Sequence, residues 1–65
     1  DTDSADDARI GYIIIYLMNS NISEAQLFLE RNKNKFNKNE KYLEAVELIE
    51  NSKISIKEIL NETGP

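Results

Sequence analysis

Residues 19–29 read NSNISEAQLFL, and residues 51–61 repeat much of this stretch as NSKISIKEILN. The first five positions of the two copies differ only where Asn21 is replaced by Lys53. Asparagine and serine followed by an apolar residue and a second serine are typical of a short turn that leads into a helix. The repeat therefore predicts two similar turns, each joining a pair of helices.

Helix-start signals follow both predicted turns. Ser23 and Gln26 have the spacing of a capping box, in which two side chains each bond a backbone amide at the start of a helix. Ser55 and Glu58 repeat this spacing in the second copy. The isoleucine before each serine is placed as a hydrophobic staple, which fixes the angle at which the helix begins. Both copies therefore predict a new helix immediately after the turn.

Two further helix starts are predicted elsewhere in the chain. The acidic segment of residues 4–7 offers a capping serine and two carboxylates for the positive end of a helix dipole. Asn37 and Glu40 form a weaker capping pattern. With these starts, the sequence predicts four short helices at roughly the following positions: 5–19, 24–35, 38–51 and 56–62.

The sequence predicts an all-α fold, because it has no interior proline and no alternating strand pattern. Two similar αα-hairpins are expected, the first over about residues 5–35 and the second over about residues 38–62. Together they would form one small bundle in a single domain, residues 1–65. The core is predicted to consist of Ile10, Ile13, Ile14, Leu17, Phe28, Val46, Ile49 and Ile59.

The first predicted helix carries more apolar surface than one core stripe needs. Its apolar residues outside that stripe are Tyr12, Ile15, Tyr16 and Met18. One interpretation is a contact face for a partner protein or for a second copy of the chain. The other is that this helix is central and that its neighbours cover the second face. Gly11 on the same helix costs about 1 kcal/mol relative to alanine, unless another helix approaches closely there.

A basic segment, RNKNKFNKNEK, covers residues 31–41. Its cations could steer an acidic partner toward the apolar face, or could bind nucleic acid with Phe36 as a stacking platform. The simpler interpretation is a solvated helix end with Phe36 turned into the core. The net charge of −4 disfavours broad binding to phosphate backbones. The predicted electrostatic rim consists of Arg31, Lys33, Lys35 and Lys38.

Several classes of function are excluded or disfavoured by composition. The chain has no cysteine and no histidine, which removes disulfides, thiolate metal sites and the commonest general base. We therefore predict a protein that is not an enzyme, with no cofactor and no metal site. The longest apolar run, residues 13–18, is far too short for a membrane span, so no membrane association is predicted. The absence of cysteine favours a cytoplasmic location.

Residues 16–31, YLMNSNISEAQLFLER, resemble the turn and second helix of a tetratricopeptide-type hairpin. Glu24-Ala25 stand where that family has a Glu-Ala pair, although the second copy has Ile56-Lys57 instead. The repeat spans 32 residues, against roughly 34 in that family. The resemblance implies stacked helical hairpins that present a concave face to a peptide or protein.

Residues 45–64, AVELIENSKISIKEILNETG, are similar to the first two-thirds of a bacterial helix-turn-helix. This resemblance implies a positioning helix opened by Ser55 and Glu58, with the turn at Thr63-Gly64. The recognition helix would follow, so no base-contacting residue is assigned. The sequence thus predicts a non-catalytic interaction or regulatory module that binds a partner protein or a second copy. The alternative is a fragment of a nucleic-acid-binding regulator.

Overall fold

The computed structural model describes the backbone of residues 2–63 and the side chains of residues 4–61. It contains the helices α1 (Thr2–Met18), α2 (Ile22–Asn32) and α3 (Asn39–Thr63), with a short 3₁₀ turn, η1 (Lys33–Lys35), after α2. The predicted all-α class is confirmed. Over the described residues, however, there are three α-helices and not the predicted four.

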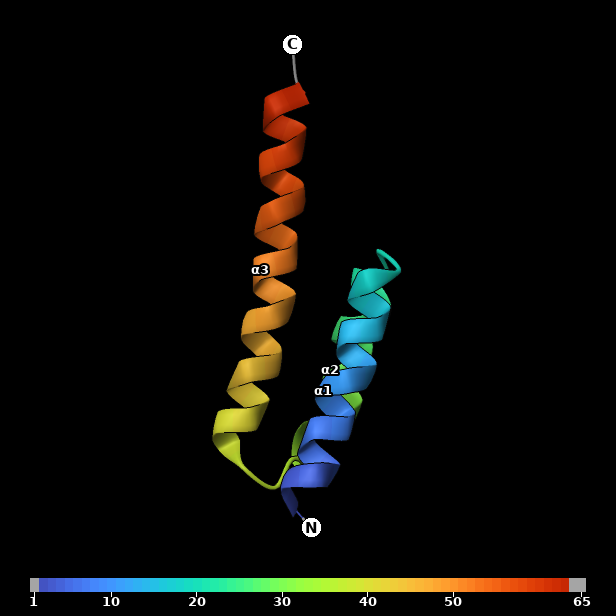
Figure 1. Cartoon of the computed structure of the whole chain (residues 1–65), viewed down its shortest axis with the longest axis vertical. Coiled ribbons are helices and arrows are strands. Elements are labelled where there is room, and N and C mark those ends of the chain that lie inside the picture. The colour runs from blue at the N-terminus through green and yellow to red at the C-terminus, as the bar shows by residue number, and fades with distance from the viewer. Residues whose placement is uncertain (1, 64–65) are drawn as a thin grey trace.

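α1 and α2 form a hairpin, and α3 lies along it before continuing well beyond its end (Figure 1). The molecule is consequently elongated, with extents of 50 × 19 × 16 Å. Within residues 2–63, only the first of the two predicted hairpins is formed. The chain between η1 and α3 crosses at the end of the bundle where the N-terminus lies (Figure 1).

The first copy of the repeat forms the predicted turn between α1 and α2. The backbone amide of Asn21 donates to the carbonyl of Tyr16 at 2.8 Å, and that of Ser20 donates to Leu17 at 3.0 Å. This pair of bonds is the Schellman arrangement, which ends a helix on a residue in the left-handed conformation. Ser20 supplies that residue with a φ of 59°, although glycine would adopt it at lower cost.

The predicted second turn is wrong, because residues 51–56 lie inside α3. Lys53 is a better helix former than its counterpart Asn21, and its Nζ lies 3.5 Å from the Glu50 carboxylate one turn earlier. The Ser52 hydroxyl donates to the carbonyl of Leu48 at 3.1 Å within the same helix. A second hairpin would need another left-handed residue and two more helix ends. Continuing α3 through residues 51–56 avoids that cost.

The predicted capping residues do not lie at the observed starts of α1 and α2. α1 already begins at Thr2, so Ser4 lies inside it, and α2 begins at Ile22, one residue before Ser23. Asn21 is the N-cap of α2, and its side chain makes no capping hydrogen bond. Its backbone carbonyl instead accepts the amide of Ala25 at 3.1 Å. The tight turn therefore fixes the start of α2 without the predicted capping box.

The core lies where the hairpin meets the first half of α3. Its buried apolar residues are Ile10, Ile13, Ala25, Leu29, Ala45 and Ile49. The two alanines allow the helices to approach each other closely. This single cluster holds all three helices together, so the fold depends on a few side chains.

The predicted core is confirmed in part. Ile10, Ile13 and Ile49 are buried as predicted, whereas Leu17, Phe28 and Val46 are partly buried at the edge of the core. Two predictions were wrong, since Ile14 and Ile59 are exposed. Ile14 lies at the margin of the α1 stripe, and Ile59 lies in the stretch of α3 over residues 54–61 that is exposed throughout.

Candidate protein-interaction surface

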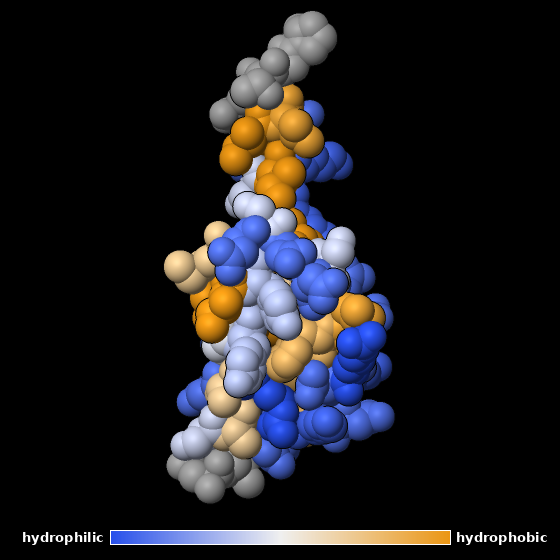
Figure 2. Space-filling view, turned by 90° about the vertical axis from the view of Figure 1, so that its right-hand side faces the viewer, coloured by the Kyte–Doolittle hydropathy of each residue, from blue (hydrophilic) through white to orange (hydrophobic). Residues whose placement is uncertain are grey.

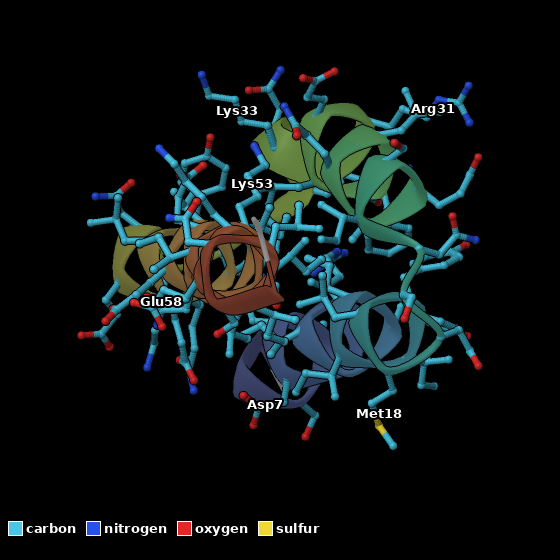
Figure 3. The ribbon with its side chains drawn as sticks, turned by 90° about the horizontal axis from the view of Figure 1, so that it is seen from above. Asp7, Met18, Arg31, Lys33, Lys53 and Glu58 are labelled. Atoms are coloured by element: carbon cyan, nitrogen blue, oxygen red, sulfur yellow. The ribbon has the colours of Figure 1, made fainter. Side chains whose placement is uncertain are left out.

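One side of α1 faces away from the bundle and is apolar. We define the outer α1 face as Tyr12, Ile15 and Met18, which follow one another every three residues and are all exposed. Met18 is 79% exposed, and its side chain points away from the other two helices (Figure 3). The outer α1 face is thus displayed on a rigid helix, and no part of the described chain encloses it.

Tyr16, the fourth residue predicted for this face, has a different position. Its ring lies against the core, with its centroid 6.1 Å from that of Phe28. Tyr12 also contacts Phe28 at a centroid distance of 5.6 Å, but it remains exposed. Phe28 therefore fixes the Tyr12 ring at one margin of the outer α1 face, while Tyr16 supports the fold beneath it.

The residues predicted as an electrostatic rim do not surround the outer α1 face. Arg31 and Lys33 lie on the opposite side of the bundle from Met18 when the molecule is viewed along its length (Figure 3). The Lys33 ammonium sits 5.9 Å from the centroid of the Tyr42 ring. Lys35 and Lys38 are exposed near the chain crossing between α2 and α3. The structure thus separates the predicted cationic residues from the predicted apolar residues.

Phe36 belongs to the fold, in agreement with the simpler interpretation of the basic segment. Its ring is half-buried against the core and meets Tyr42 edge-on at a centroid distance of 5.8 Å. The Arg9 guanidinium lies 5.9 Å from the centroid of the same ring. Because the core, Tyr42 and Arg9 already contact this half-buried ring, Phe36 is not presented as a platform for stacking bases.

Asp6 is a buried carboxylate that joins α1 to the start of α3. Its Oδ1 accepts the backbone amide of Asn37 at 2.9 Å, and its Oδ2 accepts the amide of Lys38 at 3.0 Å. The Arg9 guanidinium donates to Oδ1 at 3.2 Å. Lys38 in turn caps α3 through its carbonyl, which accepts the amide of Lys41 at 3.1 Å. Asp6 thereby holds the backbone just before α3, which begins at Asn39 and not directly after the Asn37 cap that the sequence predicts.

The charge of Asp6 is stabilised despite its burial. Burial alone raises the pKa of a carboxyl group, but the amides of Asn37 and Lys38 and the Arg9 cation together outweigh that effect. The pKa of Asp6 therefore lies below its usual value. All these bonds are directed at the protein's own backbone and side chains. Their arrangement suits a structural junction better than an acid–base role.

The described residues contain no group of three or more histidine, cysteine, aspartate or glutamate side chains able to hold a metal ion. None of the helices over residues 2–63 is long and apolar enough to cross a membrane. A groove of about 370 Å³ lies between α2 and α3, with Leu29 and Ile49 among its lining residues.

Comparison of the chain with protein-family models, with curated proteins and with solved structures found no match to any of them. The second hairpin of a tetratricopeptide-like pair is absent over the described residues, and Ser55 and Glu58 do not open a helix because they lie inside α3. Thr63 ends α3, and Gly64 lies outside the described residues.

Proposed function

We propose that this chain is a non-catalytic interaction module that binds a helix of a partner protein through the outer α1 face. The observation that carries the proposal is the exposure of Tyr12, Ile15 and Met18 together on one side of a rigid helix. Binding would remove this apolar surface from water, which is the main favourable contribution in most protein–protein association. An amphipathic helix laid along α1 would provide a matching apolar stripe.

Gly11 gives additional support to this proposal. Apart from its chain neighbours and the backbone of its own helix, a methyl group at this position would meet no atom within 4 Å, so packing against the rest of the chain does not require a glycine. A glycine inside a helix is nevertheless unfavourable by about 1 kcal/mol relative to alanine. The absence of a side chain beside Ile15 would allow a partner helix to approach the α1 backbone closely. This supports the outer α1 face as a helix-docking surface.

The alternative of nucleic-acid binding is not proposed, because no specific contact favours it. Its predicted stacking residue, Phe36, is half-buried, and Lys33 already lies over a tyrosine ring. The chain also carries net negative charge. The predicted cytoplasmic location and the predicted absence of catalysis remain predictions.

Affinity capture with two matched variants tests the proposed function. Ile15→Lys places a charge in the outer α1 face, whereas Leu43→Lys places the same charge on α3; the two side chains are 55% and 53% exposed. Each immobilised chain would be incubated with an extract of its source organism, and bound proteins identified by mass spectrometry. We expect a protein that wild type and Leu43→Lys retain and that Ile15→Lys loses by at least roughly tenfold, or about 1.4 kcal/mol.

Two results would contradict the proposal. One is that Ile15→Lys captures the same proteins in the same amounts as wild type. The other is that Leu43→Lys loses them as completely as Ile15→Lys, because the loss would then reflect added charge and not the outer α1 face. A shift of nonspecific DNA in a gel at low salt would favour the nucleic-acid alternative instead.

A further inference from the structure

We infer that the part of α3 beyond the hairpin binds a second copy of this chain, in an antiparallel pair related by two-fold symmetry. We define the α3 overhang as residues 54–63. Its residues 54–61 are exposed without exception, whereas α3 before this point contributes buried and half-buried residues to the core. The inference concerns a different helix and a different face from the proposed function, and does not depend on it.

The α3 overhang continues the same apolar stripe that forms the core. Residues that alternate in spacing by three and four lie on one side of a helix. In α3 this series is Tyr42, Ala45, Ile49, Ser52, Ile56 and Ile59. Its first four members are buried or half-buried against the hairpin, and the last two are exposed together with the neighbouring Leu60.

The space-filling view shows the same continuity. Hydrophobic colour gathers on the protruding part of α3, on the side toward which the hairpin lies farther down (Figure 2). The charged residues Lys57 and Glu58 fall outside the stripe by their helical positions, and Glu58 points away from the hairpin (Figure 3). The α3 overhang therefore has the composition of a core-facing helix surface at the place where the hairpin ends.

The position of the hairpin determines how two copies can meet. The stripe of the overhang faces the side on which the hairpin of its own chain lies. In a parallel pair the two hairpins would occupy the same space. In an antiparallel pair each hairpin lies beyond the overhang of the other copy, so the two overhangs can contact each other along their length. Such an isologous contact is closed, because each copy uses the same surface.

A hollow at the end of the hairpin is placed to receive the tip of the second overhang. It measures about 330 Å³, and its apolar lining includes Leu17, Ile22, Leu48 and Ile56. It lies where α3 leaves the hairpin, next to the beginning of the overhang. In the antiparallel pair the contact between overhangs near Ile56 and Ile59 would lead directly into this hollow on both copies. The intramolecular core would thus continue into the contact between copies.

The size of the contact suits a reversible pairing of two copies. By sequence each overhang carries one cation, Lys57, and two anions, Glu58 and Glu62, so the contact depends on its apolar residues and not on charge attraction. An overhang of ten residues is about 15 Å long, which limits the pair to the low end of stable interfaces, at or below about 1,200 Å². We therefore expect a reversible dimer that forms at high micromolar concentration.

Dimerisation through α3 leaves the outer α1 face of both copies exposed. If the proposed function also holds, the dimer would present two docking faces to a partner. Two linked binding faces raise the apparent affinity for a partner with two sites, provided that both can be engaged at once.

Sedimentation equilibrium over roughly 10 µM to 1 mM, a range suited to small interfaces, tests this inference. The informative variant is Ile59→Lys, and Ile54→Lys is its control: the two isoleucines are 58% and 52% exposed on the same overhang, but Ile54 lies outside the stripe. We expect wild type and Ile54→Lys to double in mass with rising concentration, while Ile59→Lys dimerises at least roughly tenfold more weakly. Circular dichroism checks that both variants remain helical.

Three outcomes would overturn the inference: wild type stays monomeric throughout, Ile59→Lys dimerises as well as wild type, or both lysine variants lose the dimer equally. Ile15→Lys separates this inference from the proposed function. It should dimerise like wild type if α3 carries the self-contact. Loss of the dimer in Ile15→Lys alone would assign self-association to the outer α1 face.

Discussion

Replacing Ile13 by alanine is expected to lower the free energy of unfolding by about 2–5 kcal/mol. Ile13 is fully buried, and its side chain lies in the one cluster that joins all three helices. A loss of this size is comparable to the whole stability that a single core supplies to so small a domain. The variant should therefore be largely unfolded at room temperature.

Urea unfolding followed by circular dichroism measures this effect, at a protein concentration low enough to avoid self-association. Ile15→Ala is the matched control, because it removes the same atoms from an exposed position two residues away on the same helix. It should change stability by less than about 0.5 kcal/mol. Ile13→Val, with an expected loss of about 0.5–1.5 kcal/mol, keeps the effect measurable if the alanine variant does not fold. Equal losses for Ile13→Ala and Ile15→Ala would mean that the assigned core is wrong.

Replacing Asp6 by asparagine is expected to be the most damaging polar substitution in the chain. The charged carboxylate accepts two backbone amides and the Arg9 guanidinium. Asparagine has one acceptor oxygen and turns a donor amide toward these same donors. At neutral pH the loss of stability should exceed that of Asp7→Asn several-fold. Asp7 is the suitable control because its carboxylate is exposed and pairs only with a lysine, Lys41, at the surface.

The effect of Asp6→Asn should also depend on pH. Because the pKa of Asp6 is lower in the folded chain than in the unfolded chain, the unfolded chain takes up a proton first as the pH falls. The contribution of Asp6 is thus fully present at neutral pH and is lost below about pH 4. Thermal unfolding from pH 7 to pH 2.5 should show the gap between wild type and Asp6→Asn closing in this acidic range. A gap of constant size would show that the charge of Asp6 does not stabilise the fold.

Much of the fold follows from local sequence patterns. Helical spacing of apolar residues located α1 and α2, and the first Asn-Ser-Asn-Ile-Ser segment correctly marked the turn between them. The same spacing identified Ile10, Ile13 and Ile49 as core residues. These features depend on neighbours within one or two helical turns, which is the range over which such patterns carry information.

The errors arose where a local pattern competes with the rest of the chain. Ser55 and Glu58 have the spacing of a capping box, but residues of a capping box are also tolerated inside a helix when continuing it costs less than ending it. The sequence assigned Asp6 to the start of α1. Its actual donors, the backbone amides of Asn37 and Lys38, lie 31 and 32 residues away. No pattern near Asp6 in the sequence indicates that contact.

Of the two candidate surfaces, the sequence predicted the outer α1 face in part and did not predict the α3 overhang. Surplus apolar residues on α1 pointed to an exposed face, and Tyr12, Ile15 and Met18 are indeed exposed. The position of Tyr16 against Phe28 depends on how α2 crosses α1, which helical spacing alone does not specify. The α3 overhang was not predicted, because the sequence suggested a turn at the point where the overhang begins.

The most direct test of this account compares glycine at Ser20 and at Ser52, which occupy the same place in the two copies of the repeat. Ser20 has left-handed backbone, so Ser20→Gly should stabilise the chain by roughly 1 kcal/mol. Ser52 lies inside α3, so Ser52→Gly should destabilise it by roughly 0.5 kcal/mol. Thermal unfolding of the two variants should thus shift in opposite directions. If both variants gained stability, residues 51–56 would form a second turn, and the α3 overhang would not exist.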